Sequence, residues 1–167
     1  MVHLPLNHFP INHRFRRIYR TLAGLAGLYV LIFGIIGVTK AGGTGLFGRG
    51  HIVALGLRTN MAFSILSIVV GVLVIGATLY GRNLAHFVHF FGGLVFLLAG
   101  LVMLAVLRTS ANFLNFTVAT CVVSFVIGLV MLTAGLYGRV APRHLADQEE
   151  EYRHGGVRRS MPLARNQ

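Results

Sequence analysis

The first 146 residues of this chain contain no aspartate and no glutamate, and the whole chain contains a single cysteine, Cys121. Without an acidic side chain before Asp147, a Ser/His/Asp arrangement for nucleophilic catalysis cannot be assembled. A single cysteine excludes an internal disulfide and a two-cysteine metal site, so Cys121 is expected to be a small, reduced helix-packing residue. We therefore expect a protein that is not an enzyme and that holds no metal and no other cofactor.

Charged residues are scarce along the chain as a whole. They make up 11% of the sequence, against about 25% in an average soluble domain. Hydrophobic residues make up 55%, and the mean hydropathy is +0.74. Because too little polar surface remains to cover a soluble globule, lipid must cover the apolar surface. The composition therefore predicts an integral membrane protein whose main partner is the lipid bilayer.

Four stretches contain no Asp, Glu, Lys or Arg and are long enough to cross a bilayer, which takes roughly 17–25 apolar residues. They are residues 21–38, 61–80, 87–107 and 113–137. Each is expected to be a helix, because lipid offers no partner to an unpaired backbone group. The alternative for the first stretch is a cleaved signal peptide, but its apolar run is longer than the roughly 7–15 residues of a signal sequence. The predicted fold class is an all-α membrane protein with four transmembrane helices in residues 21–138, a basic tail at 1–20 and a flexible polar tail at 139–167.

Basic residues are divided unevenly between the two sides of such a bundle. Four arginines in the N-terminal tail, one in the second connection and six in the C-terminal tail lie on one side, against four basic residues on the other. Positive charge is retained in the cytoplasm. Both termini are therefore expected to be cytoplasmic, with residues 39–59 and 108–112 facing outward.

The first connection contains a G-x-G-x-x-G pattern, from Gly43 to Gly48. A dinucleotide-binding turn must follow a strand and needs an acidic residue about 20 positions later. Here the glycines follow a transmembrane segment, and the nearest acidic residue is about a hundred positions away. We expect no nucleotide binding, and because positive-inside topology accounts for the net charge of +11, no nucleic acid either.

The same connection, residues 39–59, is the longest in the chain and holds six glycines from Gly42 to Gly56. Loops of this length are more often functional or disordered than idle. Two interpretations remain open: the loop rests on the outer membrane interface, or it docks a partner. In the second case Phe47 and Leu55 are the expected apolar anchors.

An internal repeat predicts that the chain is a duplicated helical hairpin. Residues 67–82 (SIVVGVLVIGATLYGR) align without gaps on 124–139 (SFVIGLVMLTAGLYGR), with eight of sixteen positions identical. A weaker match joins 27–38 to 93–104. The repeat contains small-xxx-small pairs that allow close approach of helix backbones, and packing within the bundle is favoured over packing against another protein. The residues concerned are Ser67, Gly71, Ser124 and Gly128.

Both copies of the repeat end in Leu-Tyr-Gly-Arg, which is typical of a membrane-interface anchor. The tyrosines of this ending are expected at the cytoplasmic headgroups and the arginines against anionic lipid; the four residues are Tyr80, Arg82, Tyr137 and Arg139. His86 and His89, at the predicted start of the third span, are expected to titrate at the interface or to contact lipid.

Two functions from different classes fit these observations. The first is a non-catalytic accessory subunit, assembly factor or scaffold that packs laterally in a larger membrane complex or a homo-oligomer. The second is a small carrier or channel for a neutral or lipidic solute. A carrier requires a cavity lined by Thr117, Thr120 and Ser124, whereas a scaffold requires a filled bundle with an exposed seam of small residues.

Three short segments resemble one family. They are residues 57–60 (LRTN), 111–114 (ANFL) and 134–140 (AGLYGRV). This combination is similar to a family of uncharacterised four-span membrane proteins of actinobacteria, a domain of unknown function, over about residues 14–140. The resemblance implies the four-helix architecture and the plasma membrane of a high-GC Gram-positive bacterium. It implies no activity, substrate or site residue.

Overall fold

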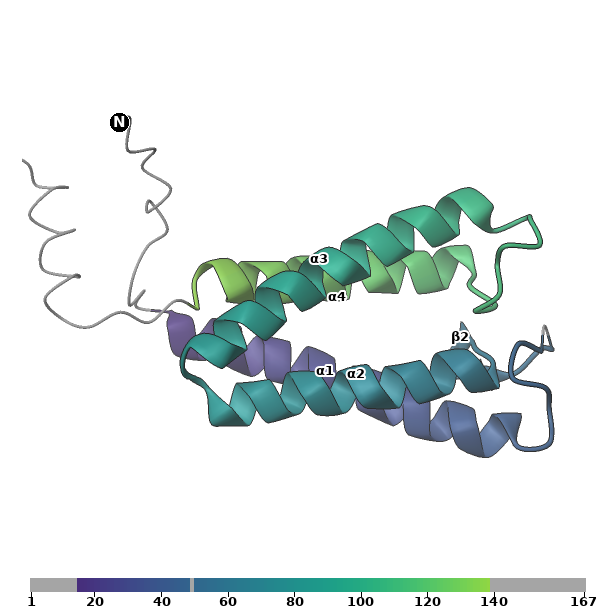
Figure 1. Cartoon of the computed structure of the whole chain (residues 1–167), viewed down its shortest axis with the longest axis horizontal. Helices are drawn as coiled ribbons and strands as arrows, with labels where there is room; N and C mark the ends of the chain where they lie inside the picture. The colour runs from purple at the N-terminus through teal and green to yellow at the C-terminus, as the bar shows by residue number, and fades with distance from the viewer. Residues whose placement is uncertain (1–14, 49, 139–167) are drawn as a thin grey trace, which may run out of the picture.

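The computed structural model describes residues 15–48 and 50–138, which form an antiparallel bundle of four long helices (Figure 1). The elements are α1 (Arg16–Ala41), β1 (Val53–Ala54), β2 (Leu57–Arg58), α2 (Met61–Tyr80), α3 (Arg82–Val106) and α4 (Val118–Leu136). Each helix is long and apolar enough to cross a membrane, which confirms the predicted fold class. We call the end where α1 begins and α4 ends the terminal end, and the opposite end the loop end.

The helix boundaries agree with the prediction for α2 and differ for the other helices. α1 begins at Arg16, so it already includes part of the segment predicted as a tail, 1–20. α3 begins at Arg82, five residues before the predicted 87. Helical structure continues past the apolar run at these points, because hydropathy marks the lipid-facing part of a helix and not its hydrogen-bonded ends. The predicted tail 139–167 lies outside the described residues.

The connection between α2 and α3 is the single residue Gly81. Its φ of 71° and ψ of −146° lie in a region open mainly to glycine. Its backbone N–H donates to the Ala77 carbonyl at 2.8 Å, so α2 ends with a closed hydrogen bond. Gly81 is therefore the residue that allows two long helices to turn back on each other without a loop.

α4 begins at Val118, five residues later than the predicted 113. Side chains in the segment before it take over the backbone hydrogen bonds that a helix would have used. The Asn112 Oδ1 accepts from the Phe116 N–H at 2.8 Å, and Asn115 has a positive φ of 57°. Thr117 then accepts from the Thr120 N–H as the N-cap. The third connection is consequently longer than the predicted 108–112.

Two helical hairpins, α1–α2 and α3–α4, make the bundle and repeat the same contacts. A Cβ added to Gly71 would lie 2.7 Å from Leu31, and one added to Gly128 would lie 2.8 Å from Leu97. Gly71 and Gly128 are aligned in the stronger repeat, and Leu31 and Leu97 are aligned in the weaker one. The duplicated hairpin seen in the sequence is thus present at the level of individual packing contacts.

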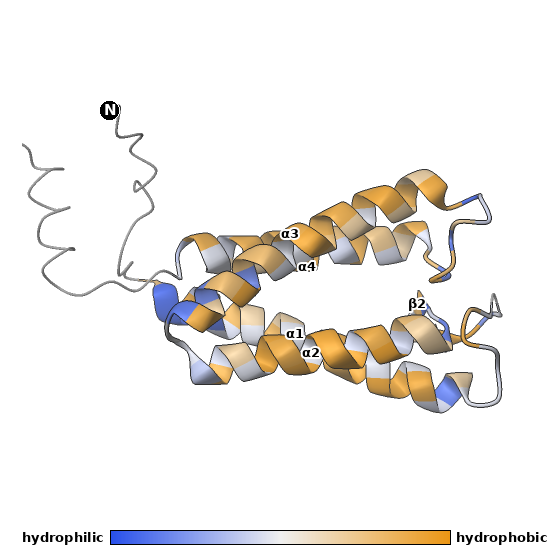
Figure 2. Ribbon diagram, in the orientation of Figure 1, coloured by the Kyte–Doolittle hydropathy of each residue, from blue (hydrophilic) through white to orange (hydrophobic). Residues whose placement is uncertain are grey.

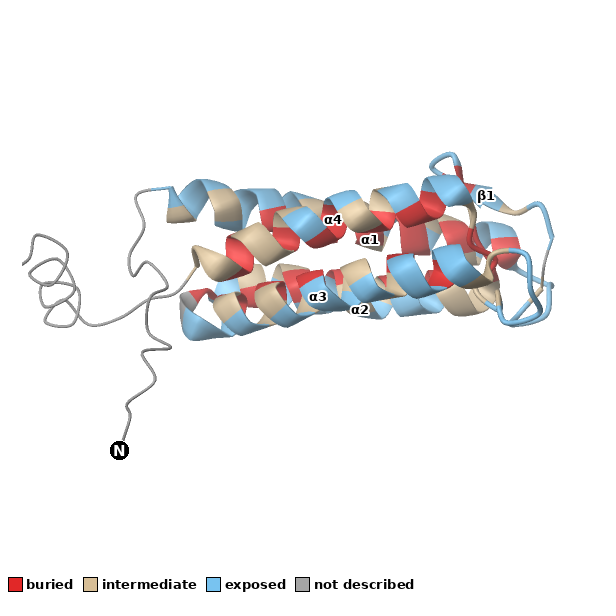
Figure 3. Ribbon diagram, turned by 90° about the horizontal axis from the view of Figure 1, so that it is seen from above, coloured by how far each residue is buried: buried red, intermediate tan, exposed pale blue. Residues whose placement is uncertain are grey.

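The two hairpins meet along α1 and α4. Val30 of α1 and Ile127 and Met131 of α4 belong to one buried cluster, which Val74 of α2 completes. The outward faces of all four helices are apolar, with polar residues gathered at the two ends (Figure 2), and they are exposed along most of their length (Figure 3). A soluble bundle exposes polar side chains on its outer faces, whereas a bundle surrounded by lipid must expose apolar ones, as this one does.

The first connection contains a small antiparallel hairpin, in which Val53 pairs with Arg58 and Ala54 with Leu57. Its two turn residues, Leu55 and Gly56, both have positive φ, at 49° and 82°. Ala54 and Leu57 are buried against Phe33 of α1. Half of the glycine-rich loop therefore covers the loop end of the bundle.

Candidate functional site

A cavity of about 360 Å³ lies between the two hairpins. All four helices contribute to its lining, together with Leu57 of β2 and Phe116 of the third connection. Aliphatic and aromatic side chains make up the lining apart from four hydroxyl-bearing residues: Tyr29, Ser67, Thr120 and Ser124. The cavity arises because α3 diverges from α2 toward the loop end (Figure 1).

Two of the four hydroxyls of the lining have partners within the protein. Ser67 Oγ donates to the Phe63 carbonyl at 2.7 Å. Thr120 Oγ1 lies 3.0 Å from Thr117 Oγ1. Because two of the four hydroxyls have partners and the rest of the lining is almost entirely apolar, the cavity has little capacity for a polar ligand and suits a hydrocarbon one.

The cavity opens sideways, between α2 and α3. The lining residues on these two helices include side chains that are well exposed, such as Leu73 at 60% and Val95 at 62%. The lining residues Val30 and Phe33 of α1 and Ile127 of α4 are all buried. The mouth, as we call the opening between α2 and α3, therefore faces the hydrocarbon interior of a bilayer.

Both ends of the cavity are closed. At the loop end the Phe63 ring packs against the rings of Phe33 and Phe116, with centroid distances of 5.2 and 4.6 Å. At the terminal end Thr78 Oγ1 and His89 Nε2 are 3.0 Å apart and join α2 to α3. Closed ends and an open side do not make a pore across the membrane, so the cavity fits a lateral binding site and not a channel.

The side chain of His89 lies in a different environment from the one predicted from the sequence. Its side chain is only 1% exposed, so the expectation that it titrates at the interface or contacts lipid is wrong. Thr78 has one hydroxyl proton, which it donates to the Val74 carbonyl at 2.7 Å, so its oxygen accepts the hydrogen bond from His89 Nε2–H. The early start of α3 explains the difference, because it carries His89 two turns into the helix.

The four small residues predicted to make helix contacts divide into two pairs. Ser67 and Ser124 line the cavity. Gly71 and Gly128 lie inside the seams of the two hairpins and are buried. The seams of small residues accordingly face neighbouring helices of the same chain. Of the hydroxyls expected around a carrier's cavity, Thr120 and Ser124 line it, whereas Thr117 caps α4.

The predicted interface anchors lie at the terminal end as far as the structure describes them. Tyr80 ends α2 and is exposed. The Tyr137 ring stacks on Tyr19 of α1, with centroids 5.4 Å apart. Arg139 and the side chain of Arg82 lie outside the described part of the chain.

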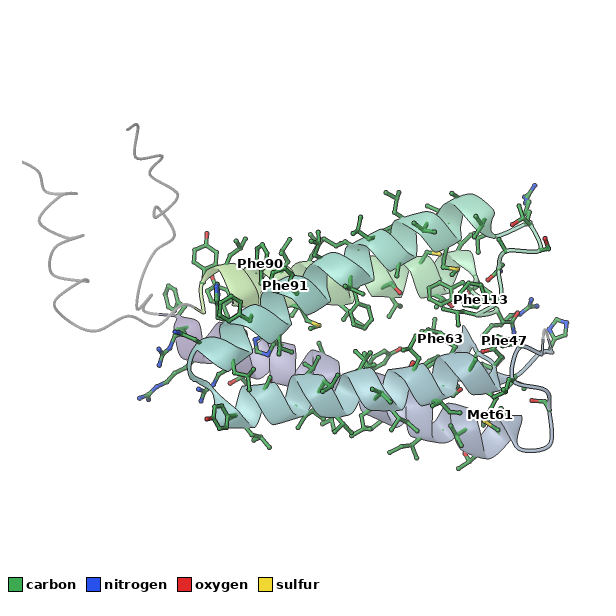
Figure 4. All side chains as sticks on the ribbon, in the orientation of Figure 1. Phe47, Met61, Phe63, Phe90, Phe91 and Phe113 are labelled. Atoms are coloured by element: carbon green, nitrogen blue, oxygen red, sulfur yellow. The ribbon has the colours of Figure 1, made fainter. Side chains whose placement is uncertain are left out.

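Phe47 and Leu55, the predicted anchors for a partner, lie in the loop-end connection. Phe47 is 57% exposed and meets the ring of Phe113 edge-on at 6.0 Å (Figure 4). Leu55 is 44% exposed at the tip of the β hairpin. Nothing in the described residues places these two side chains against each other.

Sequence reasoning missed a polar cluster that ties the first connection to the third. Asn60 Oδ1 accepts from the Phe63 N–H at 2.8 Å, and its Nδ2 donates to the Phe113 carbonyl at 2.7 Å. Asn115 Nδ2 donates to the carbonyls of Gly50 and Thr59. The segments 57–60 and 111–114 meet here, so their side chains hold the loop end together. An asparagine directly before an apolar helix was the available signal, as an N-cap.

The described residues contain no group of three His, Cys, Asp or Glu side chains that could hold a metal ion. A family model described as Domain of unknown function (DUF4383) matches residues 20–137, and the chain belongs to this family. The match extends over nearly all of the four-helix bundle, in agreement with the resemblance found in the sequence. No curated protein and no solved structure matches the chain.

Proposed function

We propose that this DUF4383 member is a non-catalytic protein of the bacterial plasma membrane, with both termini in the cytoplasm, that holds one hydrocarbon chain of a lipid or lipidic solute between its hairpins. The observation that carries the proposal is the apolar cavity with its mouth between α2 and α3. A scaffold requires a filled bundle and an exposed seam of small residues. The bundle is unfilled and the seams at Gly71 and Gly128 are buried, which favours the lipidic ligand.

The dimensions of the cavity fit one extended chain. Its lining on α3 runs from Val88 to Ala99, which corresponds to roughly 16 Å of helix at about 1.5 Å per residue. A volume of about 360 Å³ over that length gives a mean cross-section of about 20 Å². An α-helix about 10 Å wide has a cross-section of about 80 Å². A partner helix is therefore too wide for the cavity, whereas a single alkyl or isoprenoid chain is not.

Leaving this volume empty would be costly. An apolar void costs free energy that grows with its volume, because the atoms that line it lose dispersion contacts. A chain that enters through the mouth removes this cost. Since lipid tails are as apolar as the lining, there is no hydrophobic gain on transfer. Selectivity must then come from fit and from polar groups near the mouth.

The test is a pair of matched substitutions on α3. Ala99 lines the cavity, whereas Ala105 is an exposed residue of the same helix that is not part of the lining. Benzene fills a cavity of about 150 Å³. The phenyl ring of a phenylalanine would therefore occupy close to half of this cavity. The protein is reconstituted in vesicles that contain a lipid with a photoreactive diazirine on its chain.

Ala99→Phe is expected to reduce photolabelling of the lining peptides by at least half, as determined by mass spectrometry, and Ala105→Phe is expected to leave it unchanged. Labelling of the native protein should also saturate at about one chain per molecule, as one site requires. Equal labelling of the two variants, or labelling spread evenly over all lipid-facing residues, would show that the probe reports only the surrounding bilayer.

The second candidate function is an accessory subunit, assembly factor or scaffold in a larger membrane complex or homo-oligomer. The observation that favours it is the exposed apolar side chain of Leu55 in a strained turn conformation. This candidate is compatible with chain binding, because the loop and the mouth are different parts of the surface.

A further inference from the structure

A second and much smaller pocket, with a volume of only about 10 Å³, lies at the terminal end between α1, α3 and α4, and we call it the basic pocket. Four of its seven lining residues are arginine or histidine. The lining residues are Arg16, Arg20, Ala85, His86, His89, Ala134 and Gly138. The described ranges 15–48 and 50–138 contain no aspartate or glutamate, so no carboxylate in them faces the two arginines.

The electrostatics of this pocket favour an anion. Arg16 and Arg20 are four residues apart on α1 and therefore lie on the same face, where like charges repel. α1 and α3 both begin at this end without an acidic residue in the first turn, and the positive ends of their dipoles add to the arginine charges. A bound phosphate would offset all of these unfavourable terms.

The two histidines of the pocket are held in fixed orientations. His86 Nδ1–H donates to the Gly135 carbonyl at 2.5 Å, which fixes the orientation of this ring. His89 is held by its hydrogen bond to Thr78 at 3.0 Å. α3 is thereby fixed against α2 and α4 at the base of the pocket, beside the two arginines of α1.

The basic pocket lies next to the mouth of the cavity. A Cβ added to Gly81, the residue between α2 and α3, would lie 2.8 Å from Arg20 Nη1, so this guanidinium sits where the two helices that frame the mouth are joined. Along α3, Val88 of the cavity lining follows Ala85 of the pocket lining by three residues, a rise of about 4.5 Å. Thr78 and His89 close the terminal end of the cavity between the two sites, so a molecule that reaches both must leave the cavity through the mouth beside Gly81.

We propose that the arginines at the rim of the basic pocket bind the phosphate of an anionic lipid whose chain occupies the cavity, with Arg20 as the principal contact and Arg16 and His86 beside it. The inference rests on the proposed function and specifies its ligand. Basic pockets between transmembrane helices on the cytoplasmic side are known to suit anionic headgroups. The lipid would enter from the leaflet at the terminal end.

The experiment compares two lipid probes that carry the same diazirine-labelled chain, one with a phosphatidylglycerol headgroup and one with phosphatidylcholine, in vesicles containing the full-length protein. The native protein is expected to be labelled in its cavity lining more strongly by the anionic probe. Arg20→Gln should reduce this preference about fivefold, the contribution of one arginine at a lipid surface. Labelling by the phosphatidylcholine probe should not change, because the cavity is intact.

Arg17→Gln is the matched control. It removes the same charge from the same turn of α1, but Arg17 is exposed and does not line the pocket, so the preference should fall by much less. Inorganic phosphate at millimolar concentration distinguishes the two sources of a phosphate group. A lipid held at two places resists this competitor, whereas loss of the headgroup preference would overturn the assignment to a lipid.

The possible failures can be told apart. If both probes label the cavity equally and Arg20→Gln changes nothing, the headgroup inference is wrong while the chain-binding function stands. If neither probe labels the cavity lining of the native protein, the proposed function itself is wrong. If labelling by both probes decreases in Arg20→Gln, this variant has a folding defect, so its thermal unfolding is measured in parallel. Arg20→Lys, which keeps the charge, must restore the preference for the anionic probe.

Discussion

Two glycines five residues apart on α2 have opposite surroundings. A Cβ on Gly71 would lie 2.7 Å from the backbone nitrogen of Leu31, whereas a Cβ on Gly76 would have no neighbour within 4 Å. Backbone atoms of a packed helix cannot move aside as a side-chain end can. Gly71 therefore sets the separation between α1 and α2, and Gly76 does not.

We predict that Gly71→Ala lowers the free energy of unfolding by about 1–3 kcal/mol, the usual cost of forcing extra atoms into a packed interface. Gly76→Ala should be neutral or stabilising by up to about 1 kcal/mol, because alanine is the better helix former. Thermal unfolding of both variants in mild detergent, followed by circular dichroism, measures the difference. Equal stability of the two would show that α1 and α2 are not in close contact at Gly71.

Single polar residues at the loop end cap the helices and link the two hairpins. Asn60 and Thr117 each lie seven residues before one copy of the repeat and cap α2 and α4 respectively. Asn60 also donates to the Phe113 carbonyl at 2.7 Å, which links the two hairpins. A cap contributes about 1 kcal/mol, and the hydrogen bond to the Phe113 carbonyl contributes about a further 1 kcal/mol.

At the level of elements, the β hairpin carries an unfavourable residue in its turn. Both central residues have positive φ, as in the type I′ turn, for which Asn-Gly is the preferred pair. Leucine in this conformation costs roughly 1–2 kcal/mol, yet Leu55 is also substantially exposed. Strained, exposed apolar residues of this kind cluster at binding sites, which supports Leu55 as a contact for a partner protein.

The substitution Leu55→Asn is expected to change the stability of the protein and the binding of a partner in opposite directions. We predict that it raises the free energy of unfolding by about 1 kcal/mol, because asparagine tolerates positive φ. If Leu55 and Phe47 dock a partner, Leu55→Asn and Phe47→Ala should nevertheless each reduce co-purification of proteins with the native chain in mild detergent. Unchanged co-purification with both variants, or a native protein that co-purifies with nothing, would leave the loop as a cover on the bundle.

The position of a helix could be predicted from the sequence where the residues beside its first turn mark where it begins. α2 was placed correctly because Asn60 caps it directly before an unbroken apolar run. α4 was started too early because Phe113 and Leu114 are apolar, while the asparagines around them divert the backbone from helix. The β hairpin was missed because its strands are only two residues long, which is too short for an alternating pattern.

At the scale of the whole molecule, the sequence repeat and the cavity are linked. In each hairpin, glycines at the contact between the two helices allow their backbones to approach closely. The hairpins meet each other along α1 and α4 and diverge between α2 and α3, where no glycine seam draws them together. A repeat predicts the hairpin, but the distance between hairpins depends on side chains such as Phe63 that pack across the gap. The cavity could not be read from sequence for this reason.

The whole bundle should lie in the membrane with its terminal end toward the cytoplasm. Four helices place both described ends of the chain on the same side (Figure 1), and Arg16, Arg17 and Arg20 lie at that end. Positive charge is retained in the cytoplasm, so residues 42–60 should face outward. Gly45 is a suitable reporter, because it is exposed and a Cβ there meets nothing within 4 Å.

The experiment introduces one cysteine at a time into a Cys121→Ala background, since Cys121 is fully buried and alanine keeps that position apolar. A membrane-impermeant maleimide is expected to label Gly45→Cys in intact cells and Gly155→Cys only after permeabilisation. The reverse pattern would place the basic pocket outside the cell, where the anionic lipid of the inner leaflet cannot reach it. Labelling therefore tests both the topology and the premise that the proposed lipid enters from the cytoplasmic leaflet.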